Sequence, residues 1–315
     1  MFISGEIMKE DVLLSWEEYR NRPLEEFHYK SLSPVINYND TRTHLPHRYT
    51  PAPSITYRIQ DLLTRKGKPT QGLLEIKDEG GIENMLNIKF RNIILSQLAP
   101  DPLLKSMLNN KDNSSITGEI LDNLGARYIA IGDAPIYGNT PKIEEEEWLE
   151  KANSQTEAIV NDNPHVTPIG IVSGATIARS MLNIDELKER GVDKLFACHV
   201  GHILYHGNTC DKARAYMFSK EIYKKTNWLM LIGGGSYSFF QKYFFANIFV
   251  SDAHWIAAYN GFEMLKGRWH RMEPYTDPTE LGIMRNLNEE HNILAMLEGQ
   301  SKISEFIKEP VIAKY

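Results

Sequence analysis

Three aspartates stand at the ends of short apolar runs, and together they could do chemistry. Asp78 follows GLLEI (72–76), Asp133 closes RYIAIGD (127–133), and Asp252 closes ANIFVSD (246–252). Carboxyl groups that lie close together in a partly desolvated pocket differ in pKa, so one can stay ionised as a nucleophile while another carries a proton. The set therefore suits glycosyl transfer or a metal site, although a lone aspartate at a strand end is most often a turn or cap residue.

A histidine-rich stretch, CHVGHILYHGNTC (198–210), also carries reactive side chains. Its two cysteines and three histidines match no zinc signature, and glycines interrupt any helix that would align them. The alternative in which His199, His202 and the aspartates bind a metal, as in a barrel metallohydrolase, stays open. Two further features follow apolar runs, namely Ser173 after VTPIGIV and the triplet Gly233–Gly234–Gly235.

The elements that must position these residues alternate between apolar runs and helical stretches. The predicted strands are 72–76, 127–133, 166–172, 193–200, 227–233 and 246–252. The predicted helices are 83–98, 115–125, 144–160, 184–191, 210–225 and 236–246. This rhythm predicts a parallel sheet with right-handed crossovers. With two less obvious units in the first 70 residues, it favours a (β/α)8 TIM-type barrel, whose chemistry gathers at the carboxyl ends of the strands.

An open Rossmann sheet is the structural competitor of the barrel. It is weaker because no GxGxxG follows an early strand, and a glycine triplet after a late strand is also common in barrels. We expect a single domain over residues 1–315. Residues 1–70 would form an irregular N-terminal part, 71–268 the barrel units, and 269–315 a helical C-terminal segment.

Composition leaves the partner open. The chain is 42% hydrophobic and 24% charged, which is typical of globular proteins. Its net charge of −6 does not advertise a nucleic-acid binder, but local basic clusters occur in TRTHLPHRY, TRKGK and KGRWHR. Two cysteines predict no disulfide framework. The sequence has neither an apolar leader nor a run of about 20 apolar residues, so we expect a cytoplasmic protein with no membrane contact.

Several segments resemble the tRNA-guanine transglycosylase superfamily in a shared order. Residues 77–83 (KDEGGIE) resemble its TDSGGFQ segment, and Asp133 stands where the family has its FDE aspartate. Residues 168–175 resemble GIVQGG, residues 228–233 resemble YLMGVG, and residues 247–252 resemble the IDMFD strand. Residues 290–293 resemble the IHNL helix. The likeness runs from about residue 75 to 295, and the first 70 residues do not match.

The resemblance implies a role for each matching residue. Asp252 would attack C1′ of the target nucleoside, and Asp78 would act as acid and base on the purine. Asp133 would accept hydrogen bonds from guanine, and Ser173 would replace a glutamine that reads the base carbonyl. Backbone atoms would contact the base at five positions, three of which are glycines, namely Gly174, Cys198, His199, Gly233 and Gly234.

Departures from the family pattern point to one branch. The cysteines of its zinc motif are absent, so we expect no structural zinc and no cofactor. Ala253–Ile256 replace the PTR segment that grips tRNA. The chain therefore looks most like the DNA 7-deazaguanine transglycosylase branch, with preQ0 or another 7-deazaguanine as second substrate. Action on tRNA is the alternative within the same chemistry, and a non-catalytic binding relative is a further one. The sequence leaves two questions open, namely whether the chain forms a homodimer and whether an accessory protein separates the DNA strands.

Overall fold

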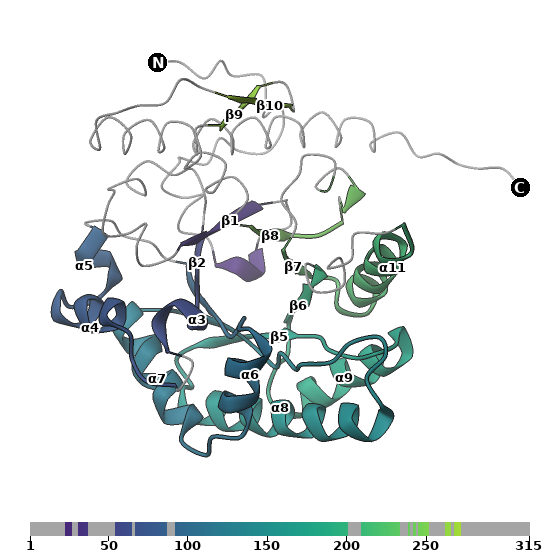
Figure 1. The fold of residues 1–315 in the computed structure, drawn as a ribbon, viewed down its shortest axis with the longest axis horizontal. Coiled ribbons are helices and arrows are strands. Elements are labelled where there is room, and N and C mark those ends of the chain that lie inside the picture. Colours follow the sequence, from purple (N-terminus) through teal and green to yellow (C-terminus); the bar gives the residue numbers. More distant parts are fainter. Residues whose placement is uncertain are drawn as a thin grey trace, which may run out of the picture.

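The computed structural model describes residues 23–26, 31–36, 54–64, 67–86, 92–200, 209–233, 239, 242–243, 245–251, 262–265 and 268–271. Eight strands form a closed parallel barrel in chain order, because each pairs with the next and β1 also pairs with β8 (Figure 1). They are β1 (Ser31–Ile36), β2 (Ser54–Arg58), β3 (Asn92–Ser96), β4 (Tyr128–Ile131), β5 (Thr167–Ile171), β6 (Leu195–His199), β7 (Met230–Ile232) and β8 (Ile248–Ser251). The closure excludes the open Rossmann sheet.

Helices alternate with the strands from β2 to β7 and lie outside the barrel (Figure 1). They are α3 (Ile59–Leu62), α4 (Gln71–Asp78), α5 (Ile82–Leu86), α6 (Asp101–Leu108), α7 (Asn113–Leu124), α8 (Lys142–Asp162), α9 (Ile177–Glu189) and α11 (Thr209–Thr226). This is the arrangement of a TIM-like α/β barrel. Helix α8 begins close to the predicted start at 144, and α9 ends close to the predicted end at 191 but begins at Ile177, well before the predicted start at 184.

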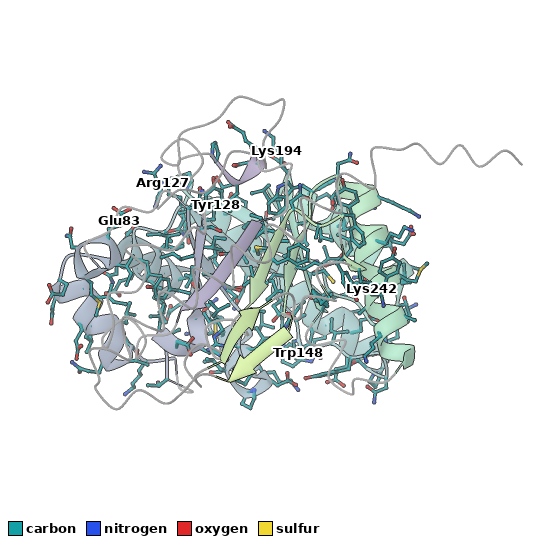
Figure 2. All side chains as sticks on the ribbon, turned by 90° about the horizontal axis from the view of Figure 1, so that it is seen from above. Glu83, Arg127, Tyr128, Trp148, Lys194 and Lys242 are labelled. Carbon is teal, nitrogen blue, oxygen red and sulfur yellow. The ribbon has the colours of Figure 1, made fainter. Side chains whose placement is uncertain are left out.

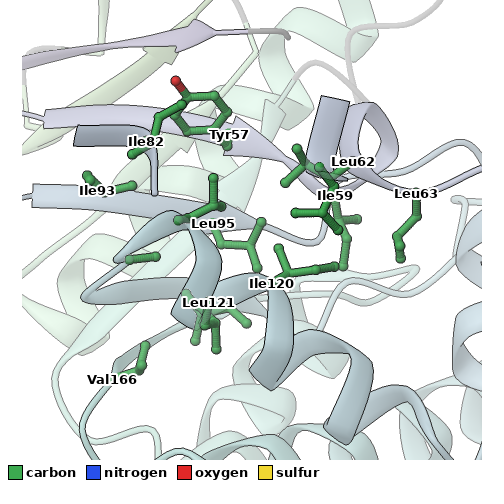
Figure 3. Packing of buried hydrophobic residues seen from close by; sticks show 14 of the residues in the cluster. Tyr57, Ile59, Leu62, Leu63, Ile82, Ile93, Leu95, Ile120, Leu121 and Val166 are labelled. Carbon is green, nitrogen blue, oxygen red and sulfur yellow. The ribbon is translucent and has the colours of Figure 1, made fainter. Parts of the chain in front are cut away.

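Strand alternation divides the core into an inner and an outer set. One cluster draws almost wholly on the strands, with residues from every strand except β2, and fills the barrel interior, for example with Val35, Ile94, Ile171, Ala197 and Val250. Two other clusters join the outward strand residues to the helices, and Figure 3 shows the first of them, around β2, β3, α3 and α7.

The amino end of the barrel is closed by a short 3-10 helix, η1 (Leu24–Glu26). Leu24 is fully buried in the interior cluster. Its N–H donates to the hydroxyl of Tyr128 at the start of β4, and its carbonyl accepts from the indole of Trp228 just before β7. Leu24 therefore occupies the amino end of the barrel interior.

Two sequence predictions for the first third of the chain are wrong. Residues 72–76 belong to helix α4 rather than to a strand, and Thr70 caps this helix by accepting from the N–H of Leu73. The strand lies instead at β3, inside the stretch predicted as helix 83–98. A continuous apolar run does not distinguish a buried strand from a helix.

The predicted domain limits also need correction. Strands β1 and β2 lie within residues 1–70, where two less obvious barrel units were expected, so the barrel begins before residue 71 and this part is not irregular throughout. Strands β9 (Phe262–Leu265) and β10 (Arg268–Arg271) form an antiparallel pair across the expected boundary at 268. The C-terminal helical segment beyond 271 lies outside the described residues. Among the helices of the described part, none has the length and apolar character of a membrane span.

Candidate active site

Four neighbouring strands end in polar side chains at the carboxyl edge of the barrel. Pairings between β3, β4, β5 and β6 keep these ends level, since Ser96 is paired with Ala130 and Ile131 with Gly170. The polar residues at or just beyond the four strand ends are Gln97, Asp133, Ser173 and His199. Three of these four positions were singled out from the sequence.

Asp133 is the most perturbed of these groups. Its side chain belongs to a residue only 8% exposed, and burial raises the pKa of its carboxyl group to about 7. The carboxylate of Asp101 raises it further, whereas the backbone N–H of Ala134, which donates to it, lowers it. A carboxyl group in this state can act as an acceptor or as an acid near neutral pH.

Glycine at position 132 allows the backbone to turn directly before Asp133. Gly132 has a φ of +92°, in the left-handed region that side chains rarely adopt. A Cβ there would also lie 3.1 Å from Leu187 and 3.4 Å from the carbonyl oxygen of Ile171. The chain can therefore leave β4 and turn at once against α9, which fixes where Asp133 stands.

The loop after β5 is held tightly beside Asp133. The N–H of Ser173 donates to Oδ1 of Asn183 over 3.0 Å, and Asn183 is fully buried in α9. The hydroxyl of Ser173 lies 3.5 Å from the carbonyl oxygen of Gly132, at the limit of a hydrogen bond. A Cβ at Gly174 would lie 2.5 Å from Oγ of Ser180, so glycine permits this close approach to α9. Ser173 and Asp133 are thus brought together.

Two side chains from outside the loop complete its support. The N–H of Ala175 donates to Oε1 of Glu145 over 2.5 Å, and Glu145 is only 6% exposed in α8. On the other side, the guanidinium of Arg214 in α11 donates to the carbonyl oxygen of Ala175 over 2.5 Å. Helices α8, α9 and α11 therefore all hold this one loop, which gives it a defined geometry.

Sequence reasoning missed three residues at this edge. Gln97 is 3% exposed, and its amide Nε2 is buried with no hydrogen-bond partner among the described residues. Asp101, the first residue of α6, accepts a hydrogen bond of 2.7 Å from the hydroxyl of Tyr137. Gln97 lay hidden because β3 was predicted as part of a helix. With β3 in place, Gln97 would have been recognised as a residue at a strand end.

Asp78 does not belong to this site, which corrects the sequence prediction. It is the last residue of α4 and is exposed. Shortly after it, a Cβ at Gly81 would lie 3.3 Å from the carbonyl oxygen of Asn123, near the end of α7. Since α7 ends just before β4 begins, Asp78 lies toward the amino edge of the barrel. The carboxyl groups of Asp78 and Asp133 are therefore at opposite ends.

The side chain of Cys198 lies on the outward side of β6. Its side chain is fully buried in the outer cluster between β6, α9 and α11, and burial raises the pKa of its thiol. The side chain points away from the barrel interior and cannot contact a base at the edge, whereas the predicted contact through the Cys198 backbone stays a prediction. His199, the next residue, is half-buried and continues the inward series of Leu195 and Ala197. Its predicted place at the edge therefore stands.

Several predicted site residues lie outside the described residues, namely His202, Gly234 and Asp252. Gly233 directly follows β7 at the edge with a φ of +82°, and its N–H donates to the carbonyl oxygen of Val250. Strand β8 ends at Ser251, directly before Asp252. Among the described residues, no group of three or more His, Cys, Asp or Glu side chains is arranged to hold a metal ion.

Comparisons with known proteins assign no relative. No protein-family model matches the chain, and no curated protein matches it significantly.

Proposed function

We propose that this chain is a transglycosylase that exchanges guanine in a nucleic acid for a 7-deazaguanine such as preQ0. The single observation that carries the proposal is the buried carboxyl group of Asp133, with a pKa of about 7 at the carboxyl edge of the barrel. We also propose that the fold is a full (β/α)8 barrel. A TIM-type barrel carries its chemistry at this edge, which supports the assignment.

The polar groups around Asp133 match the edge of a guanine. Guanine offers N1–H and a 2-amino group as donors beside the acceptor O6. The ionised carboxylate of Asp133 would accept from both donors. The amide of Gln97 and the hydroxyl of Ser173 would donate to O6, which fits the partnerless buried amide of Gln97. A buried amide without a partner costs free energy that a bound base would recover.

In the proposed reaction, a carboxylate oxygen of Asp252 attacks C1′ of the target nucleotide. The C1′–N9 bond breaks, its electron pair leaves with guanine, and guanine takes up a proton. The incoming 7-deazaguanine then attacks C1′, loses its N9 proton and releases the carboxylate. We assign this proton transfer to Asp101 in place of Asp78, because Asp101 interacts electrostatically with Asp133 and is oriented by Tyr137.

We favour DNA because Ala253–Ile256 stand where the family that the chain resembles has the PTR segment that grips tRNA. The test is to incubate the full chain with labelled guanine and either a DNA duplex, a DNA single strand or tRNA. We expect label in DNA and a denaturation-resistant protein–DNA adduct that is absent in Asp252→Asn. Label in tRNA alone would contradict the choice of DNA. An unchanged rate of exchange in D252N would contradict the nucleophile.

A further inference from the structure

One face of α11 carries a stripe of basic and aromatic side chains outside the candidate site. Lys212, Tyr216 and Lys220 are spaced four residues apart, so they share a face of the helix. The ammonium of Lys220 lies 5.5 Å from the centre of the Tyr216 ring, and that of Lys242 lies 5.3 Å from it. Lys242 lies beside α11 (Figure 2). The stripe from Lys212 to Lys220 is about 12 Å long at the rise of a helix.

Aromatic packing fixes Lys242 beside this stripe. Tyr216 makes edge contacts with Tyr243 and Phe245, at centroid distances of 5.7 Å and 5.8 Å. Lys242 also donates to the carbonyl oxygen of Lys212 over 3.4 Å. The segment between β7 and β8 is thus packed onto α11, and a lysine from each flanks one tyrosine ring.

The lysines of the stripe differ from their neighbours in their charge partners. Lys224 pairs with Glu221 and Lys225 with Asp185, each over 2.6 Å. Within the part of the chain that the structure describes, no carboxylate pairs with Lys212, Lys220 or Lys242. Their charges are therefore available to an anionic partner.

A similar arrangement on α8 has the opposite character. Lys105 and Lys151 flank the ring of Trp148, at 5.4 Å and 4.7 Å. Lys151 is neutralised by Glu147 over 2.7 Å, and α8 opens with four consecutive glutamates at 144–147. The α8 side therefore repels a polyanion, whereas the α11 side attracts one.

We propose that Lys212, Lys220 and Lys242 form a track for the phosphate backbone of the DNA whose base enters the barrel. This inference rests on the proposed function, which names DNA as the polymer. DNA carries one phosphate per 3.4 Å along each strand, so a basic stripe of about 12 Å spans several phosphates. Helix α11 follows β6 and, through Arg214, holds the Ser173 loop, so the track borders the candidate site.

The test compares two matched double variants of the full chain, K220Q/K242Q and K105Q/K151Q. Each removes two lysines that flank an aromatic ring. Binding of a fluorescent DNA oligonucleotide is measured by anisotropy over a series of salt concentrations, and thermal unfolding checks the fold. We expect K220Q/K242Q to bind roughly tenfold more weakly, with the slope of log affinity against log salt reduced by about two. We expect K105Q/K151Q to bind like the unmodified chain.

The outcomes separate this inference from the proposed function. Equal binding by K220Q/K242Q and the unmodified chain, with base exchange intact, would overturn the track and leave the function standing. Equal losses in both double variants would also overturn it, because they would indicate a general charge effect. If the unmodified chain neither binds nor modifies DNA, the proposed function fails and takes the track with it.

Discussion

The two ends of the barrel hold the same residue type in opposite environments. At the amino edge, Asp122 is exposed and its carboxylate lies 3.5 Å from the Nε2 of His165, beside a hollow of about 420 Å³ lined also by Arg127. At the carboxyl edge, Asp133 is 8% exposed, and burial raises its pKa to about 7. The hollow is the more open feature, but its groups are solvated. Desolvation, rather than the presence of a hollow, therefore marks the carboxylate of Asp133 as the one suited to chemistry.

Substitutions of Asp133 and Asp78 should differ strongly in their effect on the rate of base exchange. We expect D133N to reduce the rate of base exchange on the order of 100-fold, because an amide cannot accept from two guanine donors. D78N should exchange at the rate of the unmodified chain, since Asp78 is exposed on the far side of the barrel. Label incorporation measures both variants. A large loss in D78N would show that base exchange also depends on the amino edge of the barrel.

The second prediction concerns stability and pH. The pKa of Asp133 is about 7 in the folded chain, against 3.8 when exposed. Between these values the unfolded chain has already lost the proton that the folded chain keeps, so stability falls as pH rises. Relative to D133N, the unmodified chain should lose on the order of 4 kcal/mol of unfolding free energy between about pH 4 and pH 7. Urea unfolding across this range measures it, and parallel pH curves for the two proteins would refute the raised pKa.

A third prediction compares two asparagines. Asn183→Ala removes the buried acceptor of the Ser173 N–H and should destabilise the chain by about 1–3 kcal/mol. Asn84→Ala removes an exposed side chain that donates to the carbonyl oxygen of Gly80 near the amino edge, and should change stability by less than about 0.5 kcal/mol. Chemical unfolding measures both. Similar costs for the two variants would show that the Ser173 loop is not held as the hydrogen bonds indicate.

The smallest effect is expected at a surface ion pair of the amino side. The ammonium of Lys77 donates to Glu119 over 2.8 Å, and both side chains are more than half exposed. The hydrogen bond and charge of Glu119 raise the pKa of Lys77. Because solvent screens such pairs, K77Q should lower the unfolding temperature only slightly at low salt and not measurably at high salt. Thermal unfolding at two salt concentrations checks this.

Sequence reasoning recovered the barrel from its buried strands, but it misplaced one of them. The runs that become β4 to β8 are short, apolar and bounded by glycine, proline or aspartate, so local sequence is sufficient for them. Residues 72–76 have the same composition, yet Gly72, Leu73 and Ile76 are the buried set, at a helical spacing, while Leu74 is exposed. Only tertiary packing distinguishes the two cases.

The candidate site was recovered in part for a related reason. Asp133, Ser173 and His199 follow strands that were predicted correctly, so their place at one edge follows from topology alone. Asp78 was misplaced with its false strand, and Gln97 was missed with the true one. Asp101 and Tyr137 pair across 36 residues of sequence, a contact that depends on how α6 and the segment after β4 fold together. No local pattern indicates such a pairing.

The role of Asp133 in base binding is best tested by the affinity of the isolated base for the full chain as a function of pH. Equilibrium dialysis with labelled guanine should give an affinity for the unmodified chain that rises between pH 6 and pH 8, as the Asp133 carboxyl group ionises, and a weak, pH-independent affinity for D133N. Equal affinities of the unmodified chain and D133N throughout this range would contradict the assignment of Asp133 to the base.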